Sequence, residues 1–171
     1  TGFYRVKYQH AFLDDLKEAI LKRKLDPKDR LGLISNAFAL AQGGYIPTTE
    51  VLDLLEAYKN EDNYNVWVEI SSGLSHVSRI LENEPFRKDF KTYCRNIFSP
   101  MVKKVDWSKK SKESHSDSLL RSLILANAVK YKDEQVIAKC KVLFKSLLKG
   151  KHIDPDIKSI VYAAVAGNGA L

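Results

Sequence analysis

The feature that most constrains this chain is a helical spacing of apolar residues, which begins after Tyr8 and continues to the end of the sequence. Apolar side chains three or four positions apart lie on one face of an α-helix and can be buried together. Residues 27–42 are a clear example, because Asp26 can cap the first turn and Gly43 and Gly44 can adopt the left-handed conformation that ends a helix. The spacing therefore predicts a chain built almost entirely of helices.

The predicted helices follow one another as antiparallel neighbours joined by short turns. A first helix covers 10–24, a last one begins at 154, and three pairs lie between them: 27–42 with 49–59, 64–82 with 85–102, and 116–130 with 133–149. The helices differ in length, and no repeat of constant period is visible. We predict an all-α fold, an irregular α-superhelix of HEAT/armadillo-like helical hairpins. A compact helical bundle is the alternative.

The first eight residues, TGFYRVKY, follow a different pattern, with Tyr4, Val6 and Tyr8 directed to one side of the backbone. Aromatic and β-branched residues at a period of two are typical of a β-strand. A strand needs a partner for its backbone hydrogen bonds, and the sequence contains no second strand pattern. We therefore expect an orphan β-strand over residues 1–8 that belongs to a preceding domain, followed by a helical domain over residues 9–171.

Composition indicates a globular chain, with 44% hydrophobic and 29% charged residues. No apolar run reaches the roughly 18–20 residues of a membrane-spanning helix, so we expect no membrane association. Cys94 and Cys140 lie within predicted helices and are expected to be packed thiols rather than a disulfide. The absence of Asn-x-Ser/Thr favours a cytoplasmic location. Because Met101 is the only methionine, we expect the chain either to have been processed at Thr1 or to be a piece of a longer protein.

The formal net charge is +7, and five lysines crowd the stretch MVKKVDWSKKSKESHSD at 101–117. An anionic partner such as nucleic acid is one interpretation of this connector, and a solvated loop is the other. Acidic residues are interleaved through most of the chain, and no series of aromatic residues accompanies the lysines as base stacking requires. We interpret the charge as diffuse and nucleic-acid binding as unlikely.

The sequence contains no recognisable catalytic or metal-binding motif. Its four histidines stand in no His-Glu-x-x-His pattern and have no histidine partner three or four residues away. Neither a phosphate-binding Gly-x-x-x-x-Gly-Lys-Ser/Thr loop nor a Gly-x-Ser-x-Gly elbow is present. Two acidic pairs, Asp14–Asp15 and Glu61–Asp62, are interpreted as residues of solvated helix faces and caps. We therefore predict no catalytic residue and no metal ligand in this chain.

Four residues need a physical explanation. Gly32 lies one turn into a predicted helix, where glycine costs about 1 kcal/mol relative to alanine, and we expect another backbone to approach it closely. Arg30 is expected to pair with a neighbouring helix or terminus. Arg79 and Arg121 lie at the edges of apolar stripes, where an arginine can simply extend its charge to water. In a concave superhelix they could instead bind a substrate carboxylate.

Four stretches of the sequence, in order, resemble one family: GFYRVKY, DRLGLISNAFALAQGG, LLEAYKNEDNYNVWVEI and LLRSLIL. They are similar to the aminopeptidase N superfamily of zinc aminopeptidases, closest to its puromycin-sensitive branch, over nearly the whole chain. The resemblance implies that GFYRVKY is the last strand of a β-sandwich domain and that the remainder is the first half of a C-terminal helical superhelix. The family holds its catalytic zinc with His-Glu-x-x-His and a downstream glutamate, which this sequence lacks.

The resemblance also implies a role and a set of partners. The helical domain would enclose the active-site chamber and help select peptides, and it would pack on the catalytic and β-sandwich domains of a zinc metalloaminopeptidase. Relatives that trim long peptides use a Tyr-Lys pair to hold the peptide's terminal carboxylate. By approximate register this pair falls on Ser78 and Arg79, which keep the cation but not the tyrosine. Arg121 matches a family arginine with a structural role.

Two alternatives from other functional classes remain open. One is a free-standing helical-repeat adaptor that binds a protein partner, and the other is a basic solenoid that binds nucleic acid. Affinity that falls steeply with salt would indicate the solenoid. On the favoured interpretation, zinc and enzymatic activity belong to the parent enzyme, and the chain itself is expected to be inactive.

Overall fold

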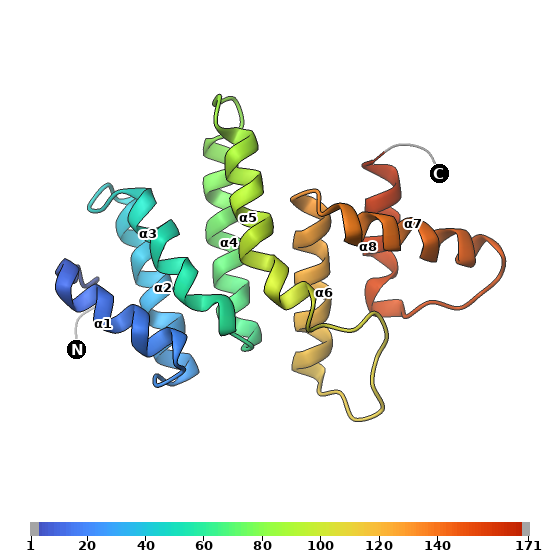
Figure 1. The fold of residues 1–171 in the computed structure, drawn as a ribbon, viewed down its shortest axis with the longest axis horizontal. Coiled ribbons are helices and arrows are strands. Elements are labelled where there is room, and N and C mark those ends of the chain that lie inside the picture. The colour runs from blue at the N-terminus through green and yellow to red at the C-terminus, as the bar shows by residue number, and fades with distance from the viewer. Residues whose placement is uncertain (1–3, 169–171) are drawn as a thin grey trace. The chain divides into compact units, whose positions relative to one another are not determined.

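The computed structural model describes residues 4–168, except for the side chains at 10 and 11, and every regular element in that range is a helix (Figure 1). The elements are α1 (His10–Leu21), α2 (Pro27–Gln42), α3 (Thr48–Leu55), a 3-10 helix η1 (Glu56–Asn60), α4 (Tyr64–Ile80), α5 (Arg87–Val102), α6 (His115–Lys130), α7 (Glu134–Leu148) and α8 (Pro155–Ala166). The all-α prediction is confirmed for these residues. The ends of α2 agree with the sequence analysis, and α1 ends three residues earlier than predicted.

Backbone contacts divide the chain after residue 79 into two compact units, which are described separately. Unit 1 comprises the described residues up to 79, and unit 2 comprises those from 80 onward. The superhelical arrangement of the hairpins and the domain boundary at residue 8 stay predictions. The predicted strand is not confirmed, because residues 4–9 form no regular element and residues 1–3 lie outside the described range.

Unit 1 contains α1, α2, α3, η1 and α4. Its most deeply buried side chains are Ile34, Val51, Leu55, Tyr58, Val66, Trp67, Ile70 and Leu74. Asp26 precedes α2 but its side chain makes no capping hydrogen bond, so the predicted cap is wrong. Gly44 ends the same helix with φ +75°, as predicted, whereas Gly43 keeps a right-handed conformation.

The segment before α1 is held on unit 1 by a side-chain amide. Asn36 of α2 accepts a hydrogen bond from the Val6 N–H (2.9 Å) and donates one to the Val6 carbonyl. Nearby, the Lys7 ammonium donates to the Tyr45 carbonyl (3.0 Å). The amide thus satisfies the same two backbone groups that a neighbouring strand would satisfy. Asn36 therefore fixes the segment on α2.

The predicted close approach at Gly32 is wrong. A Cβ atom built on Gly32 would meet nothing within 4 Å in the described part of the chain. The close approach occurs at Gly73 of α4 instead, where a Cβ would lie 2.3 Å from the ring of Phe38. The helix spacing shows neither fact, because the contact at Gly73 comes from a residue 35 positions earlier.

Gly32→Ala and Gly73→Ala are expected to change stability in opposite directions. Alanine at Gly32 should raise the unfolding free energy of unit 1 by about 0.5–1 kcal/mol, because it restricts the unfolded chain and meets no neighbour. The same change at Gly73 should lower the unfolding free energy by about 1–2 kcal/mol. The methyl group must displace the Phe38 ring, and this displacement costs more free energy than the higher helix propensity of alanine contributes. Urea unfolding followed by Trp67 fluorescence, in a Trp107→Phe background, measures both values. Two changes of equal sign would contradict this packing.

Unit 2 contains α5, α6, α7 and α8, and side-chain caps define the starts of the last three helices. Ser114 and Asp117 form a capping box at α6, Asp133 accepts from Val136 N–H at α7 (3.0 Å), and Asp154 accepts from Asp156 N–H at α8 (2.9 Å). Its main core joins α6, α7 and α8 through Leu125, Ala128, Val136, Cys140, Ile157, Val161 and Ala164. These contacts bury one face of each helix.

The prediction of packed thiols is confirmed, because Cys94 and Cys140 are both free and buried. Burial raises the pKa of Cys94 to about 12 and that of Cys140 to about 11. Both sulfurs are therefore protonated at neutral pH. A thiol in that state is a poor nucleophile, so neither cysteine is a catalytic candidate.

Candidate functional site

Arg30 is the centre of a buried ion pair in unit 1. Its side chain is 3% exposed, and its partner is Glu61, which follows η1. The Arg30 Nε donates to Glu61 Oε2 (2.6 Å) and Nη2 donates to Oε1 (2.9 Å), a bidentate arrangement. The hydrogen bond and the charge of Glu61 raise the pKa of Arg30 despite its burial.

Glu61 also organises the start of α4, so its interpretation as a solvated cap is wrong. Its Oε1 accepts the backbone N–H groups of Asp62 (2.9 Å) and Asn63 (2.8 Å), and its carbonyl accepts from Trp67 Nε1 (3.1 Å). The carboxylate thus accepts four hydrogen bonds, two from Arg30 and two from backbone N–H groups. Arg30 in turn is fixed by the Leu25 carbonyl, to which its Nη1 donates. The pair thus links the start of α2, the end of η1 and the first turn of α4.

Arg121 of α6 lies in a second buried cluster, in unit 2, and is 1% exposed. Three carboxylates surround its guanidinium: Glu113 at 3.0 Å, Asp154 at 3.2 Å and Asp156 at 3.2 Å. Its Nε has no hydrogen-bond partner among the described residues. A buried arginine already opposed by three carboxylates has no free face for a peptide carboxylate, which favours the structural interpretation of this residue.

The Arg121 cluster fixes the lysine-rich connector to the start of α8. Glu113 lies at the end of the connector, and the Lys109 N–H donates to Asp154 Oδ2 (2.8 Å). Ser118 donates to Asp156, and this hydrogen bond, followed by the charge of Arg121, lowers the pKa of that carboxyl against a partial desolvation effect. The connector is therefore attached at two points.

Arg79 is the one sequence-predicted binding residue that is open to solvent. It lies in the last turn of α4 and is exposed, with its Nη2 at 3.3 Å from His76 Nδ1. No carboxylate within 4 Å of it is found in the described part of unit 1. The guanidinium is therefore available for an anionic group that approaches the end of the helix.

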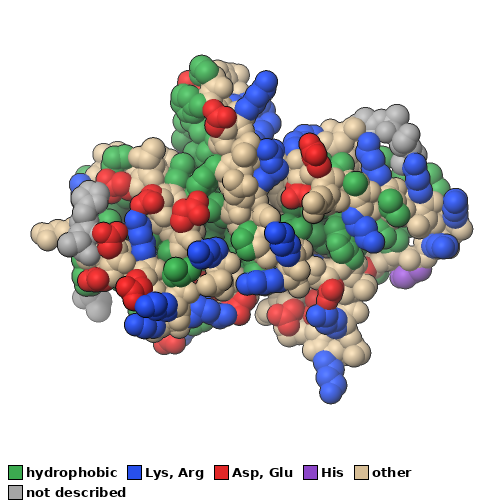
Figure 2. All heavy atoms as spheres, viewed as in Figure 1, with side chains coloured by type: hydrophobic (Ala, Val, Ile, Leu, Met, Phe, Trp, Pro, Cys, Tyr) green, Lys and Arg blue, Asp and Glu red, His purple; other side chains and the backbone are tan. Residues whose placement is uncertain are grey.

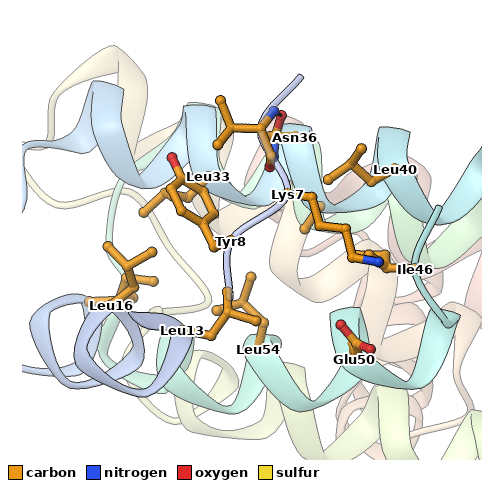
Figure 3. A pocket seen from close by; sticks show the side chains of 13 residues that line it. Lys7, Tyr8, Leu13, Leu16, Leu33, Asn36, Leu40, Ile46, Glu50 and Leu54 are labelled. Carbon is orange, nitrogen blue, oxygen red and sulfur yellow. Dashed lines mark hydrogen bonds between the residues drawn. The ribbon is translucent and has the colours of Figure 1, made fainter. Parts of the chain in front are cut away.

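One cavity of unit 1, beneath the segment before α1, is too small to hold a peptide. It lies between the segment before α1 and helices α1, α2 and α3, with a volume of about 30 Å³. Figure 3 shows leucine side chains of α1 and α2 facing the segment that carries Lys7 and Tyr8, with Glu50 at the rim. Such a volume accommodates about one water molecule. The cavity is a packing gap beneath the segment that Asn36 holds.

No group of three or more histidine, cysteine, aspartate or glutamate side chains suited to a metal ion occurs among the described residues. Each unit thus contains a buried arginine–carboxylate cluster, and Arg79 belongs to neither cluster. Sequence reasoning missed Glu61, Glu113, Asp154 and Asp156 as partners. Their acidic character near helix ends is also what capping predicts, so the sequence alone contains no signal that distinguishes a buried partner from a cap.

Comparison with known proteins yields a consistent set of relatives. The family model described as "ERAP1-like C-terminal domain" matches residues 1–170. The chain is 31% identical over 173 residues to Aminopeptidase 2 of Candida albicans, covering 99% of this chain and 19% of that protein. It is 32% identical over 170 residues to Aminopeptidase M1-B of Oryza sativa subsp. japonica, covering 96% and 19%. Puromycin-sensitive aminopeptidase of Caenorhabditis elegans is 28% identical over 172 residues, covering 99% and 18%.

The chain therefore spans about one fifth of the length of the relatives that it matches. The match covers all eight described helices. None of those helices is both long and apolar enough to cross a membrane.

Proposed function

The chain belongs to the family of ERAP1-like C-terminal domains. We propose that it is a non-catalytic helical domain of a zinc aminopeptidase. The observation that carries the proposal is the family match over residues 1–170, joined to relatives that are named as aminopeptidases. In the parent the domain encloses the active-site chamber and helps select peptides. Its partners are the catalytic domain, the preceding β-sandwich domain and the peptide substrate.

The described residues of this chain do not fit a catalytic zinc ion. The described range contains no suitable group of ligands, and its two thiols are buried and protonated. The zinc of the proposed parent is therefore held by residues outside this chain. What this chain supplies instead is a set of helical surfaces and the exposed cation of Arg79.

The proposal is tested by comparing the full-length protein with the isolated chain. The full-length protein should cleave aminoacyl-anilide substrates, lose that activity with a chelator and recover it with zinc. Residues 1–171 alone should show neither the activity nor stoichiometric zinc by elemental analysis. A full-length protein without zinc-dependent aminopeptidase activity would refute the proposed parent, and an active isolated chain would refute the non-catalytic role.

We further propose that Arg79 binds the terminal carboxylate of long peptides in the parent. In the full-length protein, Arg79→Ala should lower kcat/KM about tenfold for long peptides, because a charge-assisted hydrogen bond to the carboxylate is lost. Activity on dipeptide-like substrates, which are too short to reach the residue, should stay unchanged. Steady-state kinetics on both substrate lengths measures the difference.

A C-terminally amidated version of the long peptide is the sharpest control, since it has no carboxylate to bind. Wild type and Arg79→Ala should cleave it equally, and Arg79→Lys should keep most of the activity on the free peptide. Lys59→Ala, which removes an exposed cation from η1, should leave both substrates unaffected. Equal losses on the free and amidated peptides would exclude a carboxylate site at Arg79.

A further inference from the structure

The net charge of the chain is concentrated in unit 2, so its interpretation as diffuse is wrong. Residues 80–171 contain 18 lysines and arginines and 10 acidic residues, a formal charge of +8. Residues 1–79 contain 10 and 11, a formal charge of −1. The net positive charge of the chain therefore arises from unit 2.

One face of α7 combines lysines with an exposed apolar side chain. Lys139, Val142, Lys145 and Lys149 are spaced by three or four residues from Lys139 to the C-cap, so they lie on the same side of the helix. This side is opposite to the one that carries Val136 and Cys140 into the core. We call these four residues the α7 face. Figure 2 shows basic side chains along α7 with apolar surface between them.

The α7 face has no partner in the described part of the chain. All three of its lysines are exposed, and none lies within 4 Å of a carboxylate of residues 4–168, in contrast to Lys110 and Arg87 of the same unit. Val142 is 57% exposed although it lies at the centre of the face. The single acidic residue on α7, Glu134, lies in the first turn, at the far end of the helix from Lys149.

We propose that the α7 face is a docking surface for an acidic segment of a partner protein. Uncompensated lysines attract carboxylates, and the apolar side chain between them offers contact area that an aspartate or glutamate stem or an adjacent leucine can cover. The absence of aromatic residues from the face makes it poorly suited to nucleic-acid bases, which bind single strands largely by stacking. The proposal is independent of the proposed enzymatic parent.

The test uses two fluorescein-labelled helical peptides, each as long as α7 (15 residues). The first, the leucine peptide, has glutamates and leucines on one face of its helix. The second, the glutamine peptide, has the same charge and carries glutamine in place of each leucine. Fluorescence anisotropy measures the affinity of each peptide for the full chain and its variants at low and physiological ionic strength. The key variant is Lys139→Gln/Lys145→Gln/Lys149→Gln. Its matched control is Lys103→Gln/Lys104→Gln/Lys112→Gln, the same charge change on the connector.

The α7 triple variant should bind the leucine peptide more than tenfold more weakly than the wild type does. The connector triple variant should lose less than about threefold in affinity for the same peptide. Val142→Ser should weaken the leucine peptide about fivefold and leave the glutamine peptide unchanged, because only the former loses apolar contact. Circular dichroism confirms that each variant stays folded. Equal effects of the two triple variants would overturn the proposal. The proposal would also be overturned if a single-stranded oligonucleotide, or anionic vesicles of phosphatidylserine and phosphatidylcholine, bound the chain more tightly than the leucine peptide does and if the α7 triple variant lost that binding.

Discussion

Glu61→Gln is expected to lower the unfolding free energy of unit 1 by about 3–5 kcal/mol, because it leaves the buried charge of Arg30 unpaired. Geometry adds to this loss. The Glu61 carboxylate accepts hydrogen bonds from Arg30 and from the N–H groups of Asp62 and Asn63. A glutamine would turn its own N–H₂ group toward one set of these donors, and a buried donor without an acceptor is costly. The change is nearly isosteric, so packing is not a competing explanation.

The measurement is urea unfolding followed by Trp67 fluorescence in the Trp107→Phe background. Trp67 is fully buried and donates to the Glu61 carbonyl, so it reports on unit 1 directly. Asp62→Asn is the matched control, since Asp62 forms an ion pair with Arg23 that is about half exposed. An exposed pair contributes less than about 1 kcal/mol. If the two variants lost the same stability, the buried pair would not organise unit 1.

The double variant Arg30→Met/Glu61→Leu separates pairing from burial. Replacing both charges by apolar groups removes the unpaired ion, so the double variant should be more stable than Glu61→Gln. It should not reach wild-type stability, because the Asp62 and Asn63 N–H groups then lose their acceptor. A double variant that is less stable than the single one would show that the pair has no coupling.

Arg121→Met should lower the unfolding free energy of unit 2 by about 3 kcal/mol, because it leaves Glu113, Asp154 and Asp156 facing one another without their cation. The connector should be affected most. The Lys109 N–H donates to Asp154 (2.8 Å), so the variant should raise the hydrogen-exchange rate of this amide more than the rates of the amides of α6. Hydrogen exchange read by NMR measures both. Arg87→Met, which breaks the exposed pair with Glu82, should cost less than about 1 kcal/mol.

The pH dependence of unit 2 gives a second readout for the Arg121 cluster. The pKa of Asp156 is lowered in the folded chain, so this group contributes stability above its unfolded pKa of about 4 and loses it as the pH falls further. Wild-type unit 2 should therefore lose stability on acidification below about pH 4. In Arg121→Met the cation that helps to lower the pKa of the Asp156 carboxyl is absent, so the loss of stability should be smaller. An identical acid profile for both proteins would contradict the cluster.

Much of the fold is predictable from the sequence because it depends on local spacing. The helical period and the turn residues locate all eight helices of the described range, with ends that differ by a few residues. Gly44 and Gly150 illustrate the local rule, since both adopt the positive φ that helix ends favour. The predicted cap at Asp26 failed, because a cap also depends on the side-chain rotamer and its competing partners.

The candidate site was less predictable, because its residues interact over long separations. Arg30 and Glu61 are 31 positions apart, and Arg121 and Asp156 are 35 apart. Gly32 and Gly73 are both helical glycines, and only the position of Phe38 distinguishes them. The exposure of the α7 face likewise depends on which side of that helix packs on the core. Each case requires knowledge of which helix neighbours which.

The sequence by itself determined the helical class, the helix order and the membership in a family of aminopeptidase domains, because periodicity and motif order are properties of the linear chain. Only the tertiary structure decided which charges are buried. Whether an acidic residue near a helix end is a solvated cap or the partner of a buried arginine depends on its desolvation, and desolvation is set by neighbours from distant parts of the chain.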